Sequence, residues 1–213
     1  RNLDVAWSCT SRTDTMTESL AEEMFLAGCD SIFYGIESLS SERQAWTGKK
    51  LKPKKIQEAI ELTARQHMVP CTGIIIGFPD ESVEEFDLTV ATALRWRTET
   101  SINAQVSTAM LRYYPGADLF EHADQLAYDA LAATDSASVP GYEIREDWRD
   151  RTHLFPLQAI HTRPEETRRN ILRRDFVRTL LKVCPLTFRA CEQVLGLKPM
   201  ALFDAMSADR EFA

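Results

Sequence analysis

Residues 73–82 read GIIIGFPDES, and this stretch decides the fold class. A segment made only of Gly and Ile predicts a strand that is covered on both faces, as in the parallel sheets of α/β proteins. Its glycines, Gly73 and Gly77, fall on one side of the strand because side chains alternate, so that side leaves room for a group to lie against the backbone. The FPDES segment predicts a turn at the carboxyl end of the strand, where α/β folds bind their ligands. We therefore predict a ligand-binding edge here.

On both sides of this strand, strand and helix patterns alternate along the first half of the chain. Strands are predicted over residues 3–10, 31–37, 71–77 and 102–111. Helices are predicted over residues 17–27, from residue 53, and from residue 83 behind a capping box of Ser82 and Glu85. This order is typical of right-handed parallel crossovers. Four strands are too few to close a barrel, so the sheet is either small and open or part of a larger barrel.

Each predicted helix carries an apolar stripe at helical spacing. The stripes consist of Leu20, Met24 and Ala27; of Ile56, Ala59, Ile60 and Thr63; and of Phe86, Val90, Ala93 and Leu94.

The last third of the chain shows a different pattern. Residues 123–163 have no clear period and predict an irregular connector. Residues 164–213 predict a helical appendage, with a first helix from Pro164 that Pro185 ends and shorter helices near 188–195 and 200–206. The apolar stripe predicted for the first helix consists of Ile171, Leu172, Phe176, Leu180 and Val183.

Composition excludes several classes of function. The 213 residues carry a formal net charge of −7, which does not indicate nucleic acid or an anionic membrane as the main partner. No apolar run approaches the ~20 residues that span a bilayer, and no secretory signal is seen. The five cysteines are scattered, so we predict free thiols of a cytoplasmic protein and no metal site. Because the first residue is Arg and not Met, we expect the chain to be cut from something longer.

Polar and small residues collect at the predicted strand ends. Arg12 follows the first strand, Glu37 and Ser38 end the second, and Ser107 and Ala109 lie in the fourth. Residues that alternate on one face of each strand are small or polar, so converging faces predict a lumen for an elongated polar ligand.

Glu37 is the strongest of these candidates. A carboxylate next to a buried strand costs free energy unless it is bonded, and a ribose diol is one partner that would satisfy it. The alternative is a structural Glu that caps a loop or pairs with Arg12. Arg12 in turn either holds a ligand carboxylate or pairs with Asp14.

Three motifs in this order resemble the later half of radical S-adenosylmethionine (SAM) enzymes, nearest to the branch shared by cobalamin-binding radical enzymes, methylthiotransferases and elongator-type catalytic subunits. They are residues 28–38 (GCDSIFYGIES), residues 73–82, and residues 113–117 (YYPGA). The resemblance covers residues 1–122 and implies that they form strands three to six of a partial parallel (β/α)6 barrel. The fold class expected is therefore α/β, a partial barrel of about four strands and three helices plus the helical appendage.

The resemblance also implies a SAM site. Glu37 matches the position that contacts the ribose, and Arg12 is a looser match to a polar residue near the cofactor. Segments that match those beside the adenine contribute Gly73, Ile75, Gly77, Ala109, Leu111 and Tyr113. Ser38 and Ser107 are further candidates for binding the cofactor.

One family motif is missing. The Cys-x3-Cys-x2-Cys loop that holds the [4Fe-4S] cluster is absent, and the five cysteines of this chain do not have that spacing. We therefore expect the carboxyl-terminal part of a radical SAM enzyme, inactive alone, whose partner is the missing amino-terminal half of the barrel. Cobalamin is an additional cofactor in part of that branch, and the substrate is not predicted.

Two alternatives stay open. One is a non-catalytic α/β binding or scaffolding module. The other is a parallel-sheet protein for a phosphorylated metabolite, which Pro79 and the acidic residues after it disfavour because they offer few N–H donors and repel phosphate.

Overall fold

The structure is a computed structural model that describes residues 5–78, 80–113, 157–158 and 164–208. The chain divides into two compact units. The first comprises residues 1–75, 81–109 and 176–213, and the second comprises residues 76–80 and 110–175. The domain boundaries predicted near residues 122 and 163 lie outside the described residues.

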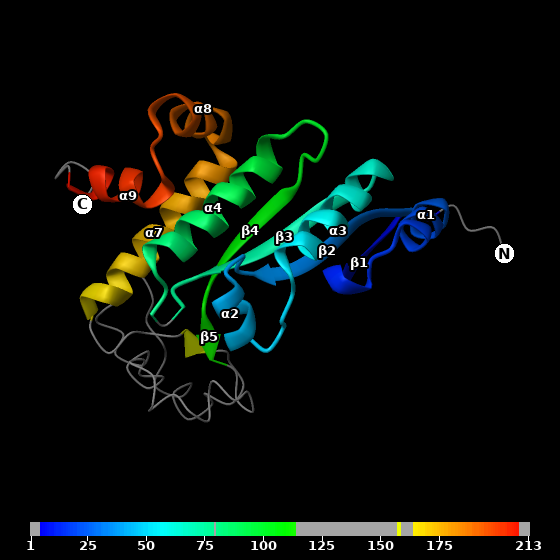
Figure 1. The fold of residues 1–213 in the computed structure, drawn as a ribbon, viewed down its shortest axis with the longest axis horizontal. Helices are drawn as coiled ribbons and strands as arrows, with labels where there is room; N and C mark the ends of the chain where they lie inside the picture. Colours follow the sequence, from blue (N-terminus) through cyan, green and yellow to red (C-terminus); the bar gives the residue numbers. More distant parts are fainter. Residues whose placement is uncertain (1–4, 79, 114–156, 159–163, 209–213) are drawn as a thin grey trace. The chain divides into compact units, whose positions relative to one another are not determined.

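The first unit is built on a sheet of four strands in the order β1-β2-β3-β4 (Figure 1). The strands are β1 (Trp7–Ser11), β2 (Cys29–Glu37), β3 (Val69–Ile76) and β4 (Gln105–Met110). All four run parallel, and the helices α1 (Glu18–Leu26), α3 (Pro53–Arg65) and α4 (Val83–Thr98) connect them in turn. The predicted α/β class is confirmed. A turn of 3-10 helix η1 (Thr13–Thr15) and a short helix α2 (Ser41–Trp46) were not predicted.

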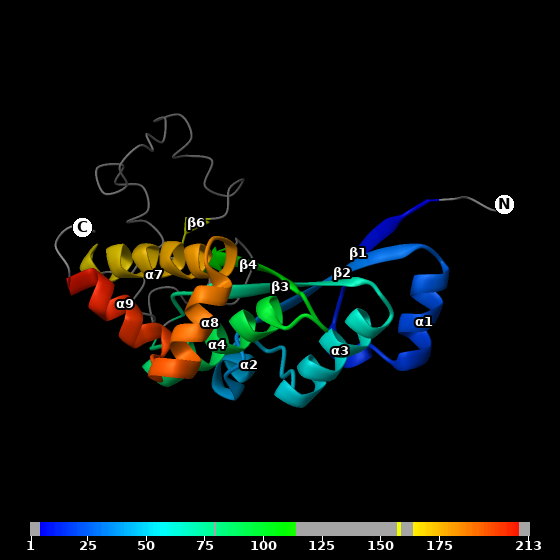
Figure 2. The same cartoon turned by 90° about the horizontal axis from the view of Figure 1, so that it is seen from above.

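Helices α1, α3 and α4 lie on the same side of the sheet (Figure 2). In α3 the buried residues are Ile56, Ala59, Ile60 and Thr63, which confirms the predicted stripe. The three apolar ones pack with Ile32, Tyr34 and Ile36 of β2 in one core cluster. Burying each large apolar side chain contributes about 1.5–3 kcal/mol, so this face holds the unit together.

The buried hydroxyl group of Tyr34 has a hydrogen-bond partner within this core. The hydroxyl groups of Tyr34 and Thr63 lie 2.8 Å apart in a buried hydrogen bond. Burial raises the pKa of Tyr34 to about 12.

In α1 the predicted buried face is partly wrong. Ala21 is fully buried and Met24 packs against the core, whereas Leu20 is 37% exposed. The buried face of α1 is centred on Ala21, so Leu20, one position earlier, lies at the edge of that face.

Helix α4 begins with the predicted capping box. The Ser82 hydroxyl accepts from the Glu85 N–H at 3.2 Å, and the Glu85 carboxylate accepts from the Ser82 N–H at 3.0 Å. These two bonds satisfy backbone donors that a helix start leaves unpaired.

The carboxyl-terminal helices are α7 (Pro164–Lys182), α8 (Pro185–Leu195) and α9 (Pro199–Ala208). As predicted, α7 ends before Pro185. Its predicted stripe is partly wrong, because Val177 and Leu181 are buried with Leu180, whereas Leu172 and Val183 are exposed. The start of α9 bonds to α4, where the Asp87 carboxylate accepts from the Met200 N–H at 2.7 Å.

The second unit contains a two-stranded antiparallel pair, β5 (Arg112–Tyr113) and β6 (Leu157–Gln158). In the part of the chain that the structure describes, every helix is too short or too polar to cross a membrane.

Candidate functional site

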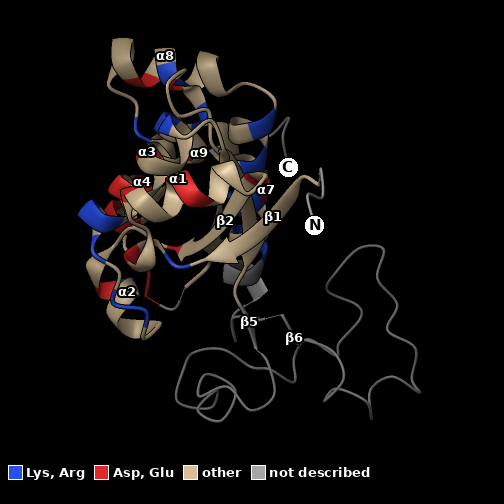
Figure 3. Cartoon of the chain, turned by 90° about the vertical axis from the view of Figure 1, so that its right-hand side faces the viewer, with Lys and Arg blue, Asp and Glu red and all other residues tan. Residues whose placement is uncertain are grey.

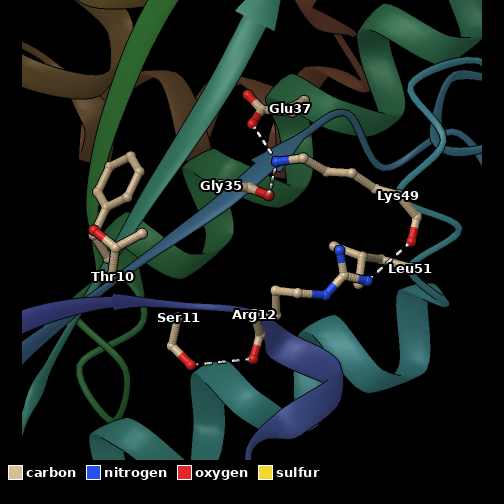
Figure 4. Close-up of a pocket in the computed structure, with 8 residues that line it drawn as sticks. Thr10, Ser11, Arg12, Gly35, Glu37, Lys49 and Leu51 are labelled. Atoms are coloured by element: carbon tan, nitrogen blue, oxygen red, sulfur yellow. Dashed lines mark hydrogen bonds and ion pairs between the residues drawn. The ribbon is translucent and has the colours of Figure 1, made fainter.

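A cavity of about 430 Å³ lies at the carboxyl ends of β1 and β2 (Figure 4). Three short segments of the first unit line it. They are the end of β1 with Thr10, Ser11 and Arg12, the end of β2 with Phe33, Gly35 and Glu37, and the loop between α2 and α3 with Lys49 and Leu51. The structure thus brings two of the predicted site residues, Arg12 and Glu37, to one cavity.

Glu37 has an unusual backbone conformation. Its φ is +65°, in the left-handed region that a residue with a side chain rarely adopts. The pairing of β2 with β3 shifts here, from Gly35 opposite Gly73 to Glu37 opposite Ile74, so Ile36 is the extra residue of a β-bulge. The Ser38 N–H donates to the Ile36 carbonyl at 2.8 Å and closes a tight turn over Glu37. Strain of this kind concentrates at functional sites.

The carboxylate of Glu37 meets an ammonium group in the cavity. Lys49 Nζ lies 2.5 Å from Glu37 Oε1 and donates to the Gly35 carbonyl at 2.9 Å. The two side chains are 32% and 20% exposed, so the pair is accessible but partly removed from water. Any Cβ at position 35 would lie within 3 Å of both charged groups, so this arrangement requires Gly35. Of the alternatives left open for Glu37, pairing with Arg12 is wrong, because its ion pair is with Lys49.

Lys49 is the main residue that the sequence interpretation missed. It lies in a polar loop between two helices and belongs to no periodic pattern. The signal that could have found it is its place in the sequence, since it lies only 12 positions after Glu37.

The Arg12 side chain is held by Asp14 and by the backbone of the loop that carries Lys49. Its Nε and Nη2 atoms donate to Asp14 at 3.0 and 2.8 Å, and Nη2 donates also to the Lys49 carbonyl at 3.2 Å. The hydrogen bond raises the pKa of Arg12 and lowers the pKa of Asp14. The predicted pairing with Asp14 is therefore present, while the half-exposed guanidinium still lines the cavity.

The bare side of Gly73 faces an aromatic ring. A Cβ at Gly73 would lie 2.8 Å from Cζ of Phe33, so the ring of Phe33 takes the room that the glycine leaves. Phe33 is itself 37% exposed and lines the cavity. Ile75, on the same face as Gly73, is half-buried.

Three predicted residues, Gly77, Leu111 and Tyr113, belong to the second unit. Gly77 has φ +87°, which explains the glycine there. The Leu111 N–H donates to the Ile76 carbonyl at 3.2 Å, and the Leu111 side chain is buried. Tyr113 pairs through its backbone with Leu157. The side chain of Tyr113, together with Pro79 and residues 114–117, lies outside the described residues.

The two predicted serines differ. The Ser38 hydroxyl is buried and lies 3.2 Å from the Thr89 hydroxyl, so it is directed into the helix layer and not into the cavity. Ser107 is exposed and donates to the Thr72 carbonyl at 3.2 Å. Gln105, Ser107 and Ala109 alternate as exposed residues along β4, so they share one face as predicted.

Charges lie mainly on the helices and loops, whereas β1 and β2 carry few of them (Figure 3). The Glu37–Lys49 pair is therefore a local polar feature at the end of a mostly uncharged pair of strands. Among the described residues, no group of three or more His, Cys, Asp or Glu is placed to hold a metal ion. All five cysteines are free thiols.

Comparison with known proteins supports the resemblance drawn from the motifs. Over 180 residues, 84% of its length, the chain is 28% identical to the uncharacterized methyltransferase PH0819 of Pyrococcus horikoshii, of which it spans only 35%. It also resembles the cobalamin-dependent SAM radical enzyme OxsB with aqua-cobalamin bound, with a TM-score of 0.58 and 14% identity over 99% of this chain and 34% of that one. OxsB with aqua-cobalamin and SAM bound gives a TM-score of 0.55 and 13% identity over the same shares of each chain.

The chain thus spans about a third of the length of these proteins, and the likeness to OxsB concerns the fold. The family model that matches is the radical SAM superfamily, over residues 1–93. The resemblance is confirmed over these residues, which match the model of the radical SAM superfamily.

Proposed function

We propose that this chain forms the adenosyl side of the SAM site in a radical SAM enzyme. The observation that carries the proposal is the pair of opposite charges, 2.5 Å apart, at the carboxyl ends of two strands in a cavity of about 430 Å³. An exposed ion pair contributes little to stability, so an accessible pair on a strained turn has a better explanation in binding than in folding.

The residues present fit the groups that SAM carries. Glu37 would accept hydrogen bonds from the ribose hydroxyls, which is the role implied by the family resemblance. Lys49 and Arg12 would hold the carboxylate of the methionine part, since both present N–H donors at the cavity. Phe33 offers a partly exposed aromatic face beside Gly73.

The exposed face of β4 supports a second element of the proposal. Gln105, Ser107 and Ala109 are small or polar and are open to solvent in the first unit. We assign this face to the substrate lumen, which requires polar groups that can orient a substrate without filling the space.

The cluster ligands are proposed to come from a part of the whole protein outside this chain. When bound, the reduced [4Fe-4S] cluster would supply the electron that cleaves SAM. None of the five cysteines has the spacing to hold it, so this chain's own residues bind and orient the cofactor.

The partner that we propose is the amino-terminal half of the barrel. β1 is an end strand of the sheet, and an unpaired strand edge is a template for pairing. Beside it, Val5 and Leu26 are 56% and 76% exposed, so apolar surface is available for a further strand–helix unit.

Methyl transfer and cobalamin are proposals for the whole protein. They rest on the name of the Pyrococcus relative and on the cobalamin bound to OxsB. No residue of this chain is assigned to cobalamin.

The test is binding of S-adenosylhomocysteine to the whole protein by isothermal titration calorimetry. Glu37→Gln and Lys49→Met should each weaken binding about 10- to 100-fold, because each removes a charge-assisted hydrogen bond. Lys54→Met is the matched control, since the Lys54 side chain is 89% exposed on α3 and does not line the cavity.

Unchanged affinity in both site variants would exclude the assignment of the cavity. A wild-type protein that binds no S-adenosylhomocysteine would favour the alternative, a non-catalytic α/β binding or scaffolding module.

A further inference from the structure

A buried glutamine contacts the backbone on both sides of Glu37. Gln44 of α2 is 2% exposed, and its Nε2 donates to the carbonyl oxygens of Ile36 at 2.7 Å and Ser38 at 2.6 Å. A side-chain amide has two N–H donors, so both are used. Because these two carbonyls flank the residue with φ +65°, the amide holds the strained turn from both ends.

The same glutamine holds the loop that carries Lys49. The Leu51 N–H donates to Gln44 Oε1 at 3.2 Å, and the Lys50 N–H donates to the Gln44 backbone carbonyl at 3.0 Å. This loop has two residues with positive φ, Gly48 at +69° and Lys50 at +52°. Since Lys49 lies between the two left-handed residues, fixing residues 50 and 51 also fixes where its side chain begins.

We infer that Gln44 is a positioning residue for the SAM site, an inference that rests on the proposed function. Gln44 does not line the cavity. Its side chain bonds to both the Glu37 turn and the Lys49 loop, which supply the opposite charges of the site.

The physical reason is a population effect. A residue with a side chain is disfavoured in the left-handed region, so the turn relaxes when the amide no longer holds it. Only the fraction of molecules with Glu37 and Lys49 in place then binds the ligand, and the apparent affinity falls by that fraction.

The test compares two glutamines whose side chains each hydrogen-bond to a buried residue. Gln44→Met keeps an unbranched side chain of similar length but removes both donors and the acceptor. Gln57→Met is the matched control, because Gln57 Oε1 accepts from the buried Trp96 Nε1 at 2.7 Å and Gln57 does not line the cavity.

Two quantities are measured on the whole protein: the free energy of unfolding by urea, and the dissociation constant of S-adenosylhomocysteine. Both variants should lose stability. Gln44→Met should weaken binding about tenfold, as expected for release of a strained residue. Gln57→Met should change affinity by less than about twofold, as expected for a site without shared partners.

A second variant covers the case in which Gln44→Met does not fold. Gln44→Glu keeps the shape of the side chain, but a carboxylate cannot donate to the two carbonyls. A protonated carboxyl has one O–H donor, so the affinity of Gln44→Glu, measured relative to wild type at the same pH, should recover as the pH is lowered.

The outcomes separate the two proposals. If Glu37→Gln weakens binding but Gln44→Met behaves like Gln57→Met, the positioning role is wrong and the SAM site stands. If wild type does not bind, or if Glu37→Gln and Lys49→Met both bind normally, the proposed function itself fails.

Discussion

At the scale of single residues, Glu37 combines a charged side chain with a backbone conformation that suits glycine. The sequence identified its carboxylate as a candidate, because an acid that ends a buried strand needs a partner. The sequence did not indicate its φ of +65°, because this angle depends on the bulge opposite Gly73 and Ile74. Both features indicate that the Glu37 side chain has a role in binding, because its backbone conformation costs stability.

This leads to a prediction for two substitutions of Glu37. Glu37→Gly and Glu37→Ala both remove the ion pair with Lys49, but only glycine adopts φ +65° without strain. The glycine variant should therefore be more stable than the alanine variant by about 1 kcal/mol, measured by urea unfolding. Equal stability of the two variants would show that the left-handed conformation is not held in solution.

Ser38 and Gly73 show the limit of residue-level interpretation. Ser38 was predicted at the cofactor site because of its place at a strand end, and Gly73 because its segment matches the one beside the adenine. The Ser38 hydroxyl instead bonds to Thr89, 51 positions further along the chain, and the ring of Phe33 lies against Gly73. Neither contact has a local signal in the sequence.

At the scale of elements, the predictions of helices and their buried faces were correct where apolar residues repeat over several helical turns. The 13-residue helix α3 buries the four predicted residues, and the capping box of α4 forms as predicted. The six-residue helix α2 is too short to show a period, so it was missed. In α7, contacts with α8 and α9 decide which side is buried, as shown by the ring of Phe176 at 6.5 Å from that of Phe188.

The turns that end α1 and α2 provide a prediction at this scale. Gly28 has φ +90°, and a Cβ there would lie 2.6 Å from the backbone oxygen of Val5. Gly48 has φ +69°, but a Cβ there would meet nothing within 4 Å. Gly48→Ala should cost about 1 kcal/mol of conformational strain alone.

Gly28→Ala should cost about 1–3 kcal/mol more than Gly48→Ala, because the clash is with backbone, which cannot rotate away. Thermal unfolding of the two variants against wild type measures the difference. If the two variants were equally stable, the close approach of Val5 to the end of α1 would be contradicted.

At the scale of the whole molecule, two acids of α4, the half-buried Glu85 and the buried Asp87, give opposite dependences of stability on pH. Burial acts to raise the pKa of Glu85, but hydrogen bonds from Ser40, the Ser82 N–H and Arg43 outweigh it, so its pKa is below the ordinary 4.5. Burial raises the pKa of Asp87 above the ordinary 3.8, and the bond from the Met200 N–H offsets this in part.

The signs follow from proton binding. The stability from Glu85 is present above pH 4.5 and is lost as the pH falls through its lowered pKa. The contribution of Asp87 is fully present below pH 3.8 and is lost as the pH rises through its raised pKa. The two effects therefore oppose each other in acid.

We expect Glu85→Gln to flatten the loss of stability between about pH 5 and pH 3, and Asp87→Asn to steepen it. One unit of pKa difference corresponds to about 1.4 kcal/mol, so slopes of unfolding free energy against pH resolve the effects. A slope that Glu85→Gln leaves unchanged would show that this carboxylate is not held by Ser40 and Arg43.

The sequence by itself determined the strand–helix order, the parallel sheet, the capping box and the likeness to radical SAM enzymes, because each follows from local periods or contiguous motifs. It also placed Glu37 and Arg12 at the strand ends. Only the tertiary structure decided that Lys49 meets Glu37, that Gln44 holds both of their segments, and that Ser38 is directed away from the cavity. These contacts join segments whose spacing follows no period, and they form only when the chain packs, so burial and backbone geometry specify them.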